Sequence, residues 1–366
     1  MAGAIIRSRR LTNPMEHTME AAQRAAAREA WLESTLAAME RRQIAKPMPL
    51  TAEASTRRFT RIITDAGPLV LMDAPPETEN NAAFLALAPW LRKHGLHAPE
   101  VHAADPQQGF MLLEDLGDHL LGTALANTDA AGRRDLYRLA ITTLIRFQCA
   151  GRDDPPSVPA YDRARLEREL GLFRDWFAQG LLQHLPPDAT WADTVAALTA
   201  TALAQPRACV YLDYHSRNLL LLEHGGEQVL GLVDFQDVHA GPVCYDLVSL
   251  LRDCYLRWPE AEVRALRGDY LEAARAAGVP GLEDESAFVR GFDLCGAQRH
   301  LKALGIFARV ALTRGQTHYF DAMPRVLAHL AEVLPRYPET EALGRWLASE
   351  IEPVLPAVLA RHRAAS

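Results

Sequence analysis

The stretch YLDYHSRNLLLLEHGGEQVLGLVDF, residues 211–235, decides the fold because it joins a polar loop to two apolar runs. The runs flank Gly225–Gly226, and glycine readily adopts positive φ, which predicts a β-hairpin. A hairpin centred on Gly226 places Asn218 opposite Asp234. Opposed residues on antiparallel strands lie about 4.5–5.5 Å apart. We therefore expect an amide oxygen and a carboxylate to meet at the open end of the hairpin.

Asp213 lies in the same loop, five residues before Asn218, and adds a third polar group. Hard oxygen ligands suit Mg²⁺, which takes one or two protein oxygens together with substrate phosphates. An Asp near a metal-bound γ-phosphate can orient an attacking hydroxyl, as in kinase-type phosphoryl transfer. Asp and Asn are also common hairpin-end residues, so the spacing alone is weak. The complete arrangement favours catalysis, with Asp213 as the base and Asn218 and Asp234 as Mg²⁺ ligands.

Composition excludes several classes of function. Lys plus Arg is 39 and Asp plus Glu is 46, and the net charge of −7 argues against a nucleic-acid or anionic-membrane surface. The signatures of P-loop, dinucleotide-binding, serine-hydrolase and zinc-protease folds are absent from the sequence. We therefore expect small-molecule partners, no nucleic acid and no membrane.

The cysteines indicate the compartment. There are five, an odd number, and none are spaced as C-x-x-C, which favours reduced thiols in a cytoplasmic protein. No window approaches the roughly 18 apolar residues that span a bilayer. We expect a cytoplasmic monomer.

The hydrophobic pattern predicts an α+β chain of two lobes, a small β-rich one and a large helical one. We expect a leader and helix at 1–44, a β-rich N-lobe at 45–116 and a helical C-lobe at 117–366. Strands are predicted around the turns DAGP and DPQQG, and a cleft between two lobes would be a preferred ligand site. Helices are predicted at 18–43, 81–94, 130–150, 162–179, 191–204, 249–257, 260–277, 285–313, 321–334 and after 339.

Several motifs together resemble the aminoglycoside phosphotransferase family, the small-molecule branch of the protein-kinase-like fold. They are DYHSRNLL, GLVDFQDVHAGPVCYDLVSLLRD and MLLEDLG. Within it, LMDAPPE, QGFMLLEDLG and QRHLKALGIFARV resemble the anomeric N-acetylmuramate/N-acetylglucosamine kinases of peptidoglycan recycling. The match covers roughly residues 47–337. It implies an ATP-dependent kinase that converts the C1 hydroxyl of an amino sugar to the α-1-phosphate.

The resemblance also assigns the nucleotide site and the support of the loop. The inter-lobe linker would offer backbone groups to adenine at Glu114, Asp115 and Leu116. Arg57 and Arg58 are candidates for the phosphates, and at most one should reach ATP because adjacent strand residues face opposite sides. A solvated strand face is the alternative. His215 would support the loop, and Asp246 would either accept hydrogen bonds from the loop or cap a helix that begins near Ser249.

The sugar needs polar groups near Asp213. Gln298 and Lys302 are four residues apart and would share one face of a helix. A cation there would suit the carboxylate of N-acetylmuramate, although a solvated helix face is the alternative. The candidates for sugar binding are Gln236, Asp237, His239, Gln298, Arg299, His300 and Lys302.

The sequence departs from the family pattern at three places. Tyr211 and Leu212 stand where kinase loops carry His and Arg, which should affect the geometry of the loop more than its reactivity. Ala52 and Glu53 replace a Gly and an Asp of the phosphate-covering turn, and Met72 replaces a phosphate-pairing Lys. Two alternatives therefore stay open: a kinase for another small hydroxyl substrate, aminoglycoside- or choline-like, and a nucleotide-binding pseudokinase.

Overall fold

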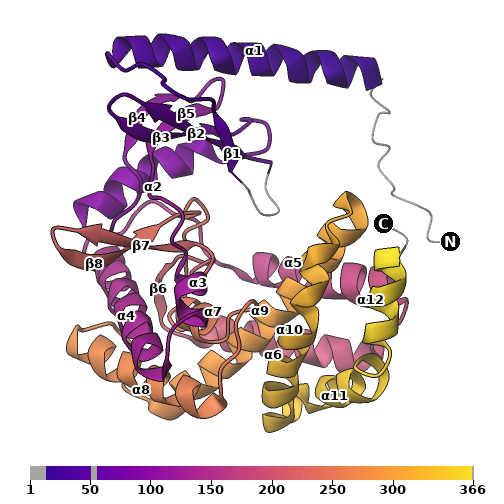
Figure 1. The fold of residues 1–366 in the computed structure, drawn as a ribbon. Coiled ribbons are helices and arrows are strands. Elements are labelled where there is room, and N and C mark those ends of the chain that lie inside the picture. The colour runs from indigo at the N-terminus through magenta and orange to yellow at the C-terminus, as the bar shows by residue number, and fades with distance from the viewer. Residues whose placement is uncertain (1–13, 51–55, 365–366) are drawn as a thin grey trace. The chain divides into compact units, whose positions relative to one another are not determined.

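The computed structural model describes residues 14–50 and 56–364 (Figure 1). By its contacts the chain separates into two compact units, which we describe one by one. The first holds the residues up to Ala82 together with Glu100–Asp115, and the second holds Ala83–Pro99 together with Leu116–Ser366. Residues 83–99, which we expected in the N-lobe, thus group with the helical residues.

The first unit is a helix with a five-stranded antiparallel sheet of order β1-β2-β3-β5-β4. The expected strand pairs around the two turns are present, whereas the three-residue β1 was not expected. The expected α+β class, with a small antiparallel sheet and a large helical part, is confirmed. The elements are α1 (Pro14–Ala38), β1 (Met48–Leu50), β2 (Arg58–Thr64), β3 (Gly67–Asp73), β4 (Val101–Asp105) and β5 (Phe110–Glu114).

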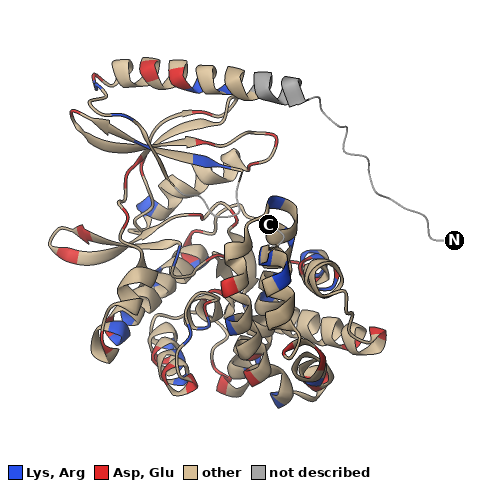
Figure 2. Ribbon diagram, turned by 45° about the vertical axis from the view of Figure 1, so that its right-hand side comes forward, with Lys and Arg blue, Asp and Glu red and all other residues tan. Residues whose placement is uncertain are grey.

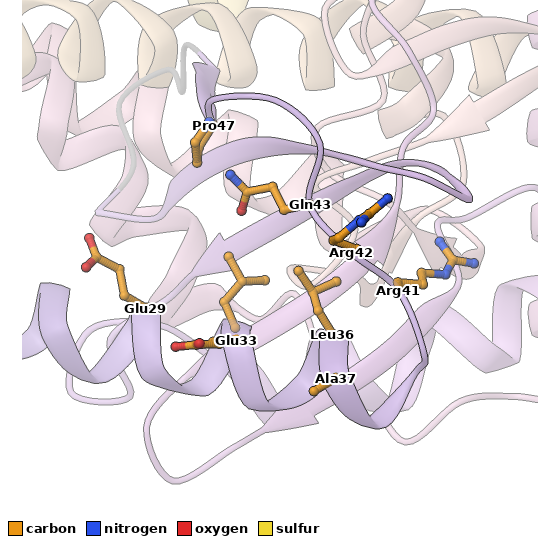
Figure 3. Close-up of a pocket in the computed structure, with 9 residues that line it drawn as sticks. Glu29, Glu33, Leu36, Ala37, Arg41, Arg42, Gln43 and Pro47 are labelled. Atoms are coloured by element: carbon orange, nitrogen blue, oxygen red, sulfur yellow. The ribbon is translucent and has the colours of Figure 1, made fainter.

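Helix α1 covers one face of this sheet and is fixed to it by apolar packing and by charge. Leu32 and Leu36 pack in a core with sheet residues such as Leu112. Arg24 Nε donates to the buried Asp73 carboxylate at 2.8 Å. A pocket of 560 Å³ opens beside the end of α1, and its lining includes the apolar Leu36 and the charged Glu29, Glu33, Arg41 and Arg42 (Figure 3).

The second unit is mainly helical, with most of the expected helices within a few residues of their predicted ends. Both basic and acidic residues are distributed along its helices (Figure 2). Within the described ranges, no helix combines the length and apolar character needed to cross a membrane. The helices are α2 (Asn81–Lys93), α3 (Leu121–Ala126), α4 (Ala130–Asp153), α5 (Arg163–Leu172) with a π-helical continuation (Phe173–Leu182), α6 (Asp188–Ala204), α7 (Tyr245–Leu251), α8 (Glu260–Ala276), α9 (Glu285–Arg314), α10 (Met323–Val333), α11 (Pro338–Trp346) and α12 (Leu355–Ala364).

Two β-ribbons interrupt the helices. Strand β6 (Arg207–Val210) pairs with β9 (His239–Pro242), and β7 (Leu219–His224) pairs with β8 (Glu227–Leu232). The polar loop at residues 211–218 connects β6 to β7, so one ribbon holds the start of the loop and the other holds its end.

The register of the β7–β8 hairpin differs from our prediction by one residue. His224 pairs with Glu227, so Gly225 and Gly226 alone form the turn, both with positive φ. Two-residue hairpin loops of this kind are favoured because their twist matches that of the strands. Asn218 therefore lies opposite Val233, and its direct pairing with Asp234 was wrong.

Helix α9 packs closely against the junction of α5 and its π-helical continuation. A Cβ at Gly305 would lie 2.3 Å from the carbonyl carbon of Leu172, so only glycine allows this approach. The approach brings polar residues of α9 into contact with polar residues of α5.

Candidate active site

The loop between β6 and β7 holds Asp213 and Asn218 together. Asn218 Nδ2 donates to the backbone oxygen of Asp213 at 3.0 Å, and the His215 N–H donates to the same oxygen at 3.0 Å. The Asn218 N–H in turn donates to the His215 oxygen at 2.9 Å. Because the amide nitrogen of Asn218 is used inside the loop, its side-chain oxygen is the atom that could bind a cation.

Asp234 is placed by a sharp turn of the backbone at the end of the hairpin. The Val233 N–H donates to the Asn218 oxygen at 3.2 Å, and Asp234 follows with φ of +67°. A non-glycine residue adopts this conformation only where its surroundings hold it, and such residues gather at functional sites. Gln236 Nε2 donates to Asp234 Oδ1 at 2.9 Å, which fixes the carboxylate. Asn218 and Asp234 thus both lie at the open end of the hairpin, although they are not paired with each other.

Asp246 supports the start of the loop from the protein interior. Its carboxylate accepts the Tyr211 N–H at 2.7 Å and the Leu212 N–H at 2.9 Å. Burial raises the pKa of Asp246 to about 7, and the two N–H groups only partly oppose this effect. Helix α7 begins at Tyr245, so Asp246 lies in its first turn, and the alternative that it caps a helix from Ser249 was wrong.

Tyr211 provides a second support, at the position where kinase loops carry His. Its ring is fully buried against Phe147 and Tyr214, with ring centroids 5.7 and 5.5 Å away. Its hydroxyl donates to the Val233 oxygen at 2.7 Å and so ties the loop to the end of the hairpin. Leu212, also buried, turns the chain with φ of +72°.

Asp253 supports the second half of the loop, and the sequence did not reveal this role. Its Oδ2 accepts the Ser216 N–H at 3.0 Å, and its Oδ1 accepts the Tyr255 N–H at 2.8 Å. The ring of His215 lies 5.6 Å from that of Tyr255, consistent with a supporting position for His215. A buried Asp thus holds each end of the loop.

A group of polar side chains surrounds Glu169, where α5 meets α9. Glu169 Oε1 accepts from Arg165 Nε at 3.0 Å and pairs with Lys302 Nζ at 3.1 Å. Its Oε2 accepts from Gln298 Nε2 at 3.3 Å and from the Tyr161 hydroxyl. We call these five residues the Glu169 cluster. Gln298 and Lys302 share a helix face as predicted.

The charges of the Glu169 cluster determine the pKa of Glu169. Burial alone would raise this pKa, but Lys302, the Tyr161 hydroxyl and Arg165 together lower it below its usual value. Glu169 is therefore ionised at neutral pH. The sequence analysis missed Tyr161, Arg165 and Glu169; the available signal was a charged residue beside Leu166 and Leu170 on the apolar face of a predicted helix.

Two further sugar-site candidates adjoin this cluster. His239 Nδ1 donates to the backbone oxygen of Asp237 at 2.7 Å, and its Nε2 accepts from Arg165. Burial lowers the pKa of His239, so the ring is neutral at physiological pH. His239 and Asp237 thus join Arg165, while Gln236 contacts Asp234 instead.

The remaining candidates on α9 lie in the interior. Arg299 is buried and donates to Cys254 Sγ at 3.3 Å. His300 is 1% exposed, its Nε2 contacts the Arg252 oxygen at 2.8 Å, and its ring stacks on His329. Burial lowers the pKa of His300 well below its ordinary value. His300 is a core residue, and we remove it from the sugar-binding set.

The nucleotide candidates lie mostly in the first unit. Arg57 pairs with Glu79 at 3.2 Å, whereas Arg58 begins β2 with an exposed side chain. The Asp115 carboxylate accepts from Arg61 Nη2 at 2.9 Å. The side chain of Glu114 accepts the Glu100 N–H at 3.0 Å, and Leu116 begins the longer of the two segments that form the second unit.

The residues of the phosphate-covering turn, Ala52 and Glu53, lie outside the described residues, and the nucleotide roles proposed for the first unit stay predictions. Met72, at the position of the phosphate-pairing Lys, is buried in β3 and contributes to the core.

The oxygen atoms of Asn218 and Asp234 fit the requirements of Mg²⁺. Within residues 14–50 and 56–364 there is no group of three or more His, Cys, Asp or Glu that could hold a metal. A Mg²⁺ ion held by one amide oxygen, one carboxylate and substrate phosphates needs no such group. The amide nitrogen of Asn218 is already used, which presents its oxygen, and Asp234 is fixed by Gln236.

A small antiparallel sheet unit and a helical unit, with an Asp-x₄-Asn loop leading into a β-hairpin and an Asp directly after it, define a kinase-like phosphotransferase. The chain belongs to the phosphotransferase enzyme family, whose sequence model matches residues 47–288. It is therefore an enzyme that transfers phosphate, and the family implies ATP as the donor.

Comparison with known proteins shows which proteins this chain is similar to in sequence and in fold. The chain is 40% identical over 301 residues to an N-acetylmuramate/N-acetylglucosamine kinase of Pseudomonas putida, covering 81% of this chain and 86% of that one. It is 39% identical to a protein of the same name from Pseudomonas aeruginosa, covering 83% and 88%. Among solved structures, a choline kinase from Streptococcus pneumoniae matches with a TM-score of 0.58 at 11% identity, covering 83% and 99%, which shows a shared fold.

Proposed function

We propose that the protein is an ATP-dependent kinase of N-acetylmuramate and N-acetylglucosamine that phosphorylates the anomeric C1 hydroxyl to the α-1-phosphate in peptidoglycan recycling. The relatives that carry this name match more than four fifths of the chain. The observation that carries the proposal is the loop in which Asn218 is hydrogen-bonded to the backbone of Asp213. Asn218 is also hydrogen-bonded to Val233, which directly precedes Asp234. Such a loop serves phosphoryl transfer to a hydroxyl.

Asp213 acts on the sugar hydroxyl in this proposal. Its carboxylate accepts a hydrogen bond from the C1 hydroxyl, which directs the oxygen toward the γ-phosphorus. It takes the proton as the new P–O bond forms and the bond between the γ-phosphorus and the bridging oxygen breaks, which releases ADP. Asp246 and Tyr211 hold the backbone that carries Asp213, so the loop is positioned before substrate binds. Preorganisation of this kind accounts for much of the catalysis of phosphoryl transfer.

Asn218 and Asp234 would bind Mg²⁺, which supplies positive charge to the phosphates of ATP. The contribution of the chain is to hold the two oxygens in fixed directions through the Asp213 backbone and Gln236. We further propose that Arg58 contacts the phosphates and that the backbone of Glu114–Leu116 contacts adenine. Arg58 is preferred to Arg57, which is already paired with Glu79.

We also propose that the protein is cytoplasmic, because ATP is available inside the cell. We propose that it is a monomer. All five cysteines are free of disulfide bonds and four are buried, which supports a reducing compartment.

The test is direct transfer of phosphate from labelled ATP. The protein is incubated with ATP, Mg²⁺ and each of N-acetylmuramate, N-acetylglucosamine, choline and an aminoglycoside, and products are analysed by ³¹P NMR. We expect both amino sugars to yield a phosphate coupled to the anomeric proton. Turnover of choline or the aminoglycoside alone would identify another small hydroxyl substrate, and ATP binding without any transfer would identify a pseudokinase.

A further inference from the structure

The Glu169 cluster carries more positive than negative charge at its centre. Glu169 is a single carboxylate with two cations, Arg165 and Lys302, within 3.1 Å of its Oε1 atom. Asp237 also acts on Arg165 electrostatically. Among the described residues, Glu169 is the acidic group within ion-pair distance of Lys302. Lys302 is therefore the cation of this cluster with capacity for a further anion.

The cluster also has hydrogen-bonding capacity that the protein leaves unused. Gln298 is fully buried, and its Oε1 has no hydrogen-bond partner within the described part of the chain, although its Nε2 donates to Tyr161 and Glu169. A buried carbonyl without a donor costs free energy, so such atoms often mark a site that a ligand completes. Lys302 has three N–H donors, only one of which is directed to Glu169.

The cations of this cluster are accessible to a small molecule. The side chain of Lys302 is 14% exposed and that of Arg165 is 23% exposed, in contrast to the fully buried Gln298 behind them. Part of each charged group therefore lies at the surface of the second unit.

The cluster lies within electrostatic reach of the catalytic Asp. Burial lowers the pKa of Lys302, but the neighbouring Tyr245, Glu169 and Asp213 raise it above its ordinary value. Lys302 is therefore protonated at neutral pH. In the proposed complex, a sugar with C1 at Asp213 extends its other substituents toward this cluster.

We propose that Lys302, assisted by Arg165 and positioned by Glu169, binds the carboxylate of the lactyl group on C3 of N-acetylmuramate, and so makes the enzyme favour this sugar over N-acetylglucosamine. This inference rests on the proposed function. Only N-acetylmuramate carries the lactyl group, so a cation that contacts this group strengthens the binding of N-acetylmuramate far more than that of N-acetylglucosamine. A salt bridge strengthened by hydrogen bonding is worth roughly 10–100-fold in affinity.

The first experiment changes the substrate and leaves the protein intact. Initial rates of the wild-type enzyme are measured with N-acetylmuramate and with its methyl ester, which removes the charge and adds one methyl group. We expect kcat/KM for the ester to be roughly 10–100-fold lower. Equal kcat/KM values for acid and ester would overturn the inference, whatever the behaviour of any variant.

The second experiment changes the protein. Lys302→Met should lower kcat/KM for N-acetylmuramate at least about tenfold more than for N-acetylglucosamine, mainly through KM, and Lys302→Arg should retain the preference. The matched control is Arg309→Met, which removes an exposed cation from the same helix and should change neither sugar. Equal losses for both sugars in Lys302→Met would show that Lys302 does not recognise the carboxylate.

The inference and the proposed function fail in different ways. A wild-type enzyme that phosphorylates neither amino sugar overturns both. One that phosphorylates both but does not distinguish acid from ester keeps the proposed function and loses the carboxylate site. If Lys302→Met does not fold, as judged by circular dichroism, the ester comparison still decides.

Discussion

The loop between β6 and β7 and the Glu169 cluster each depend on a buried carboxylate, and the two carboxylates are stabilised in different ways. Asp246 accepts two neutral backbone N–H groups, and burial raises its pKa to about 7. Glu169 lies between two cations, and its pKa is lowered. Neutral donors do not fully replace water for a buried charge, whereas cations do. We infer that support of the loop depends on pH near neutrality and that the charge of the cluster does not.

The largest effect should come from separating the chemistry of the loop from its support. Asp213→Asn removes the proposed base but keeps the size of the side chain and the backbone oxygen that Asn218 contacts. We expect kcat to fall about a thousandfold, as is usual for loss of a general base, with little change in melting temperature or ATP affinity. Initial rates and thermal shifts with ATP measure these quantities. Activity within tenfold of wild type would show that Asp213 is not the base.

Asp246→Ala should break the support of the loop and lower stability and activity together. It leaves the N–H groups of Tyr211 and Leu212 buried without a partner, at about 1–3 kcal/mol each. We expect the free energy of unfolding to fall by about 2–5 kcal/mol in urea titrations, with reduced kcat. Asp193→Ala, at an exposed helical site, is the control and should be near neutral. A stable, fully active Asp246→Ala variant would show that the two bonds are dispensable.

The raised pKa of Asp246 predicts a pH dependence of stability. Between its ordinary pKa of 3.8 and its folded value of about 7, the native state keeps a proton that the unfolded chain releases. The free energy of unfolding should therefore fall as pH rises through this window, by at most about 1.4 kcal/mol per pH unit from this group. Urea titrations at pH 5, 6 and 8 should show the fall in wild type and a smaller one in Asp246→Asn. Parallel profiles would contradict the assignment.

The smallest effect is expected for Glu169 near neutral pH, where its charge state does not change. A lowered pKa means that its contribution to stability is complete above the ordinary value of 4.5 and is lost as pH falls through the folded value. The stability difference between wild type and Glu169→Gln should be constant from pH 5.5 to 8 and shrink below pH 4.5. A difference that varies between pH 6 and 8 would remove the contrast with Asp246.

Much of the fold could be predicted because it follows from periodic patterns. The strand pairs, most helices and the β7–β8 hairpin follow from alternation, helical spacing and glycine turns. The register of the hairpin did not, because two adjacent glycines allow turns centred on either one, and a one-residue change alters every pairing. The left-handed turn at Asp234 then brings the residue to the end of the hairpin in a way that no spacing rule predicts.

The sequence offers candidates for the site only where a residue belongs to a motif, and their roles stay predictions. Asp213, Asn218 and Asp234 belong to a motif, whereas Arg165 and Glu169 come from a helix outside the motifs. The segment QRHLK shows the same limit. Lys302 meets Glu169 while His300 stacks on His329, and the sequence cannot say which face of a buried helix is lined by polar neighbours. Partners on other elements, distant in sequence, decide which polar residue is structural.

The hydrogen bond from the Tyr211 hydroxyl to the Val233 oxygen bears on how inactive kinases are recognised. A survey that scores the residues before the catalytic Asp by their identity would class this chain as degenerate, because His and Arg are absent. A survey that scores the contacts of those residues would class the support of the loop as preserved, because Tyr211 connects the loop to the segment that leads to Asp234. Screens for lost catalysis among such proteins should therefore score the connection between these two segments instead of the letters of the motif.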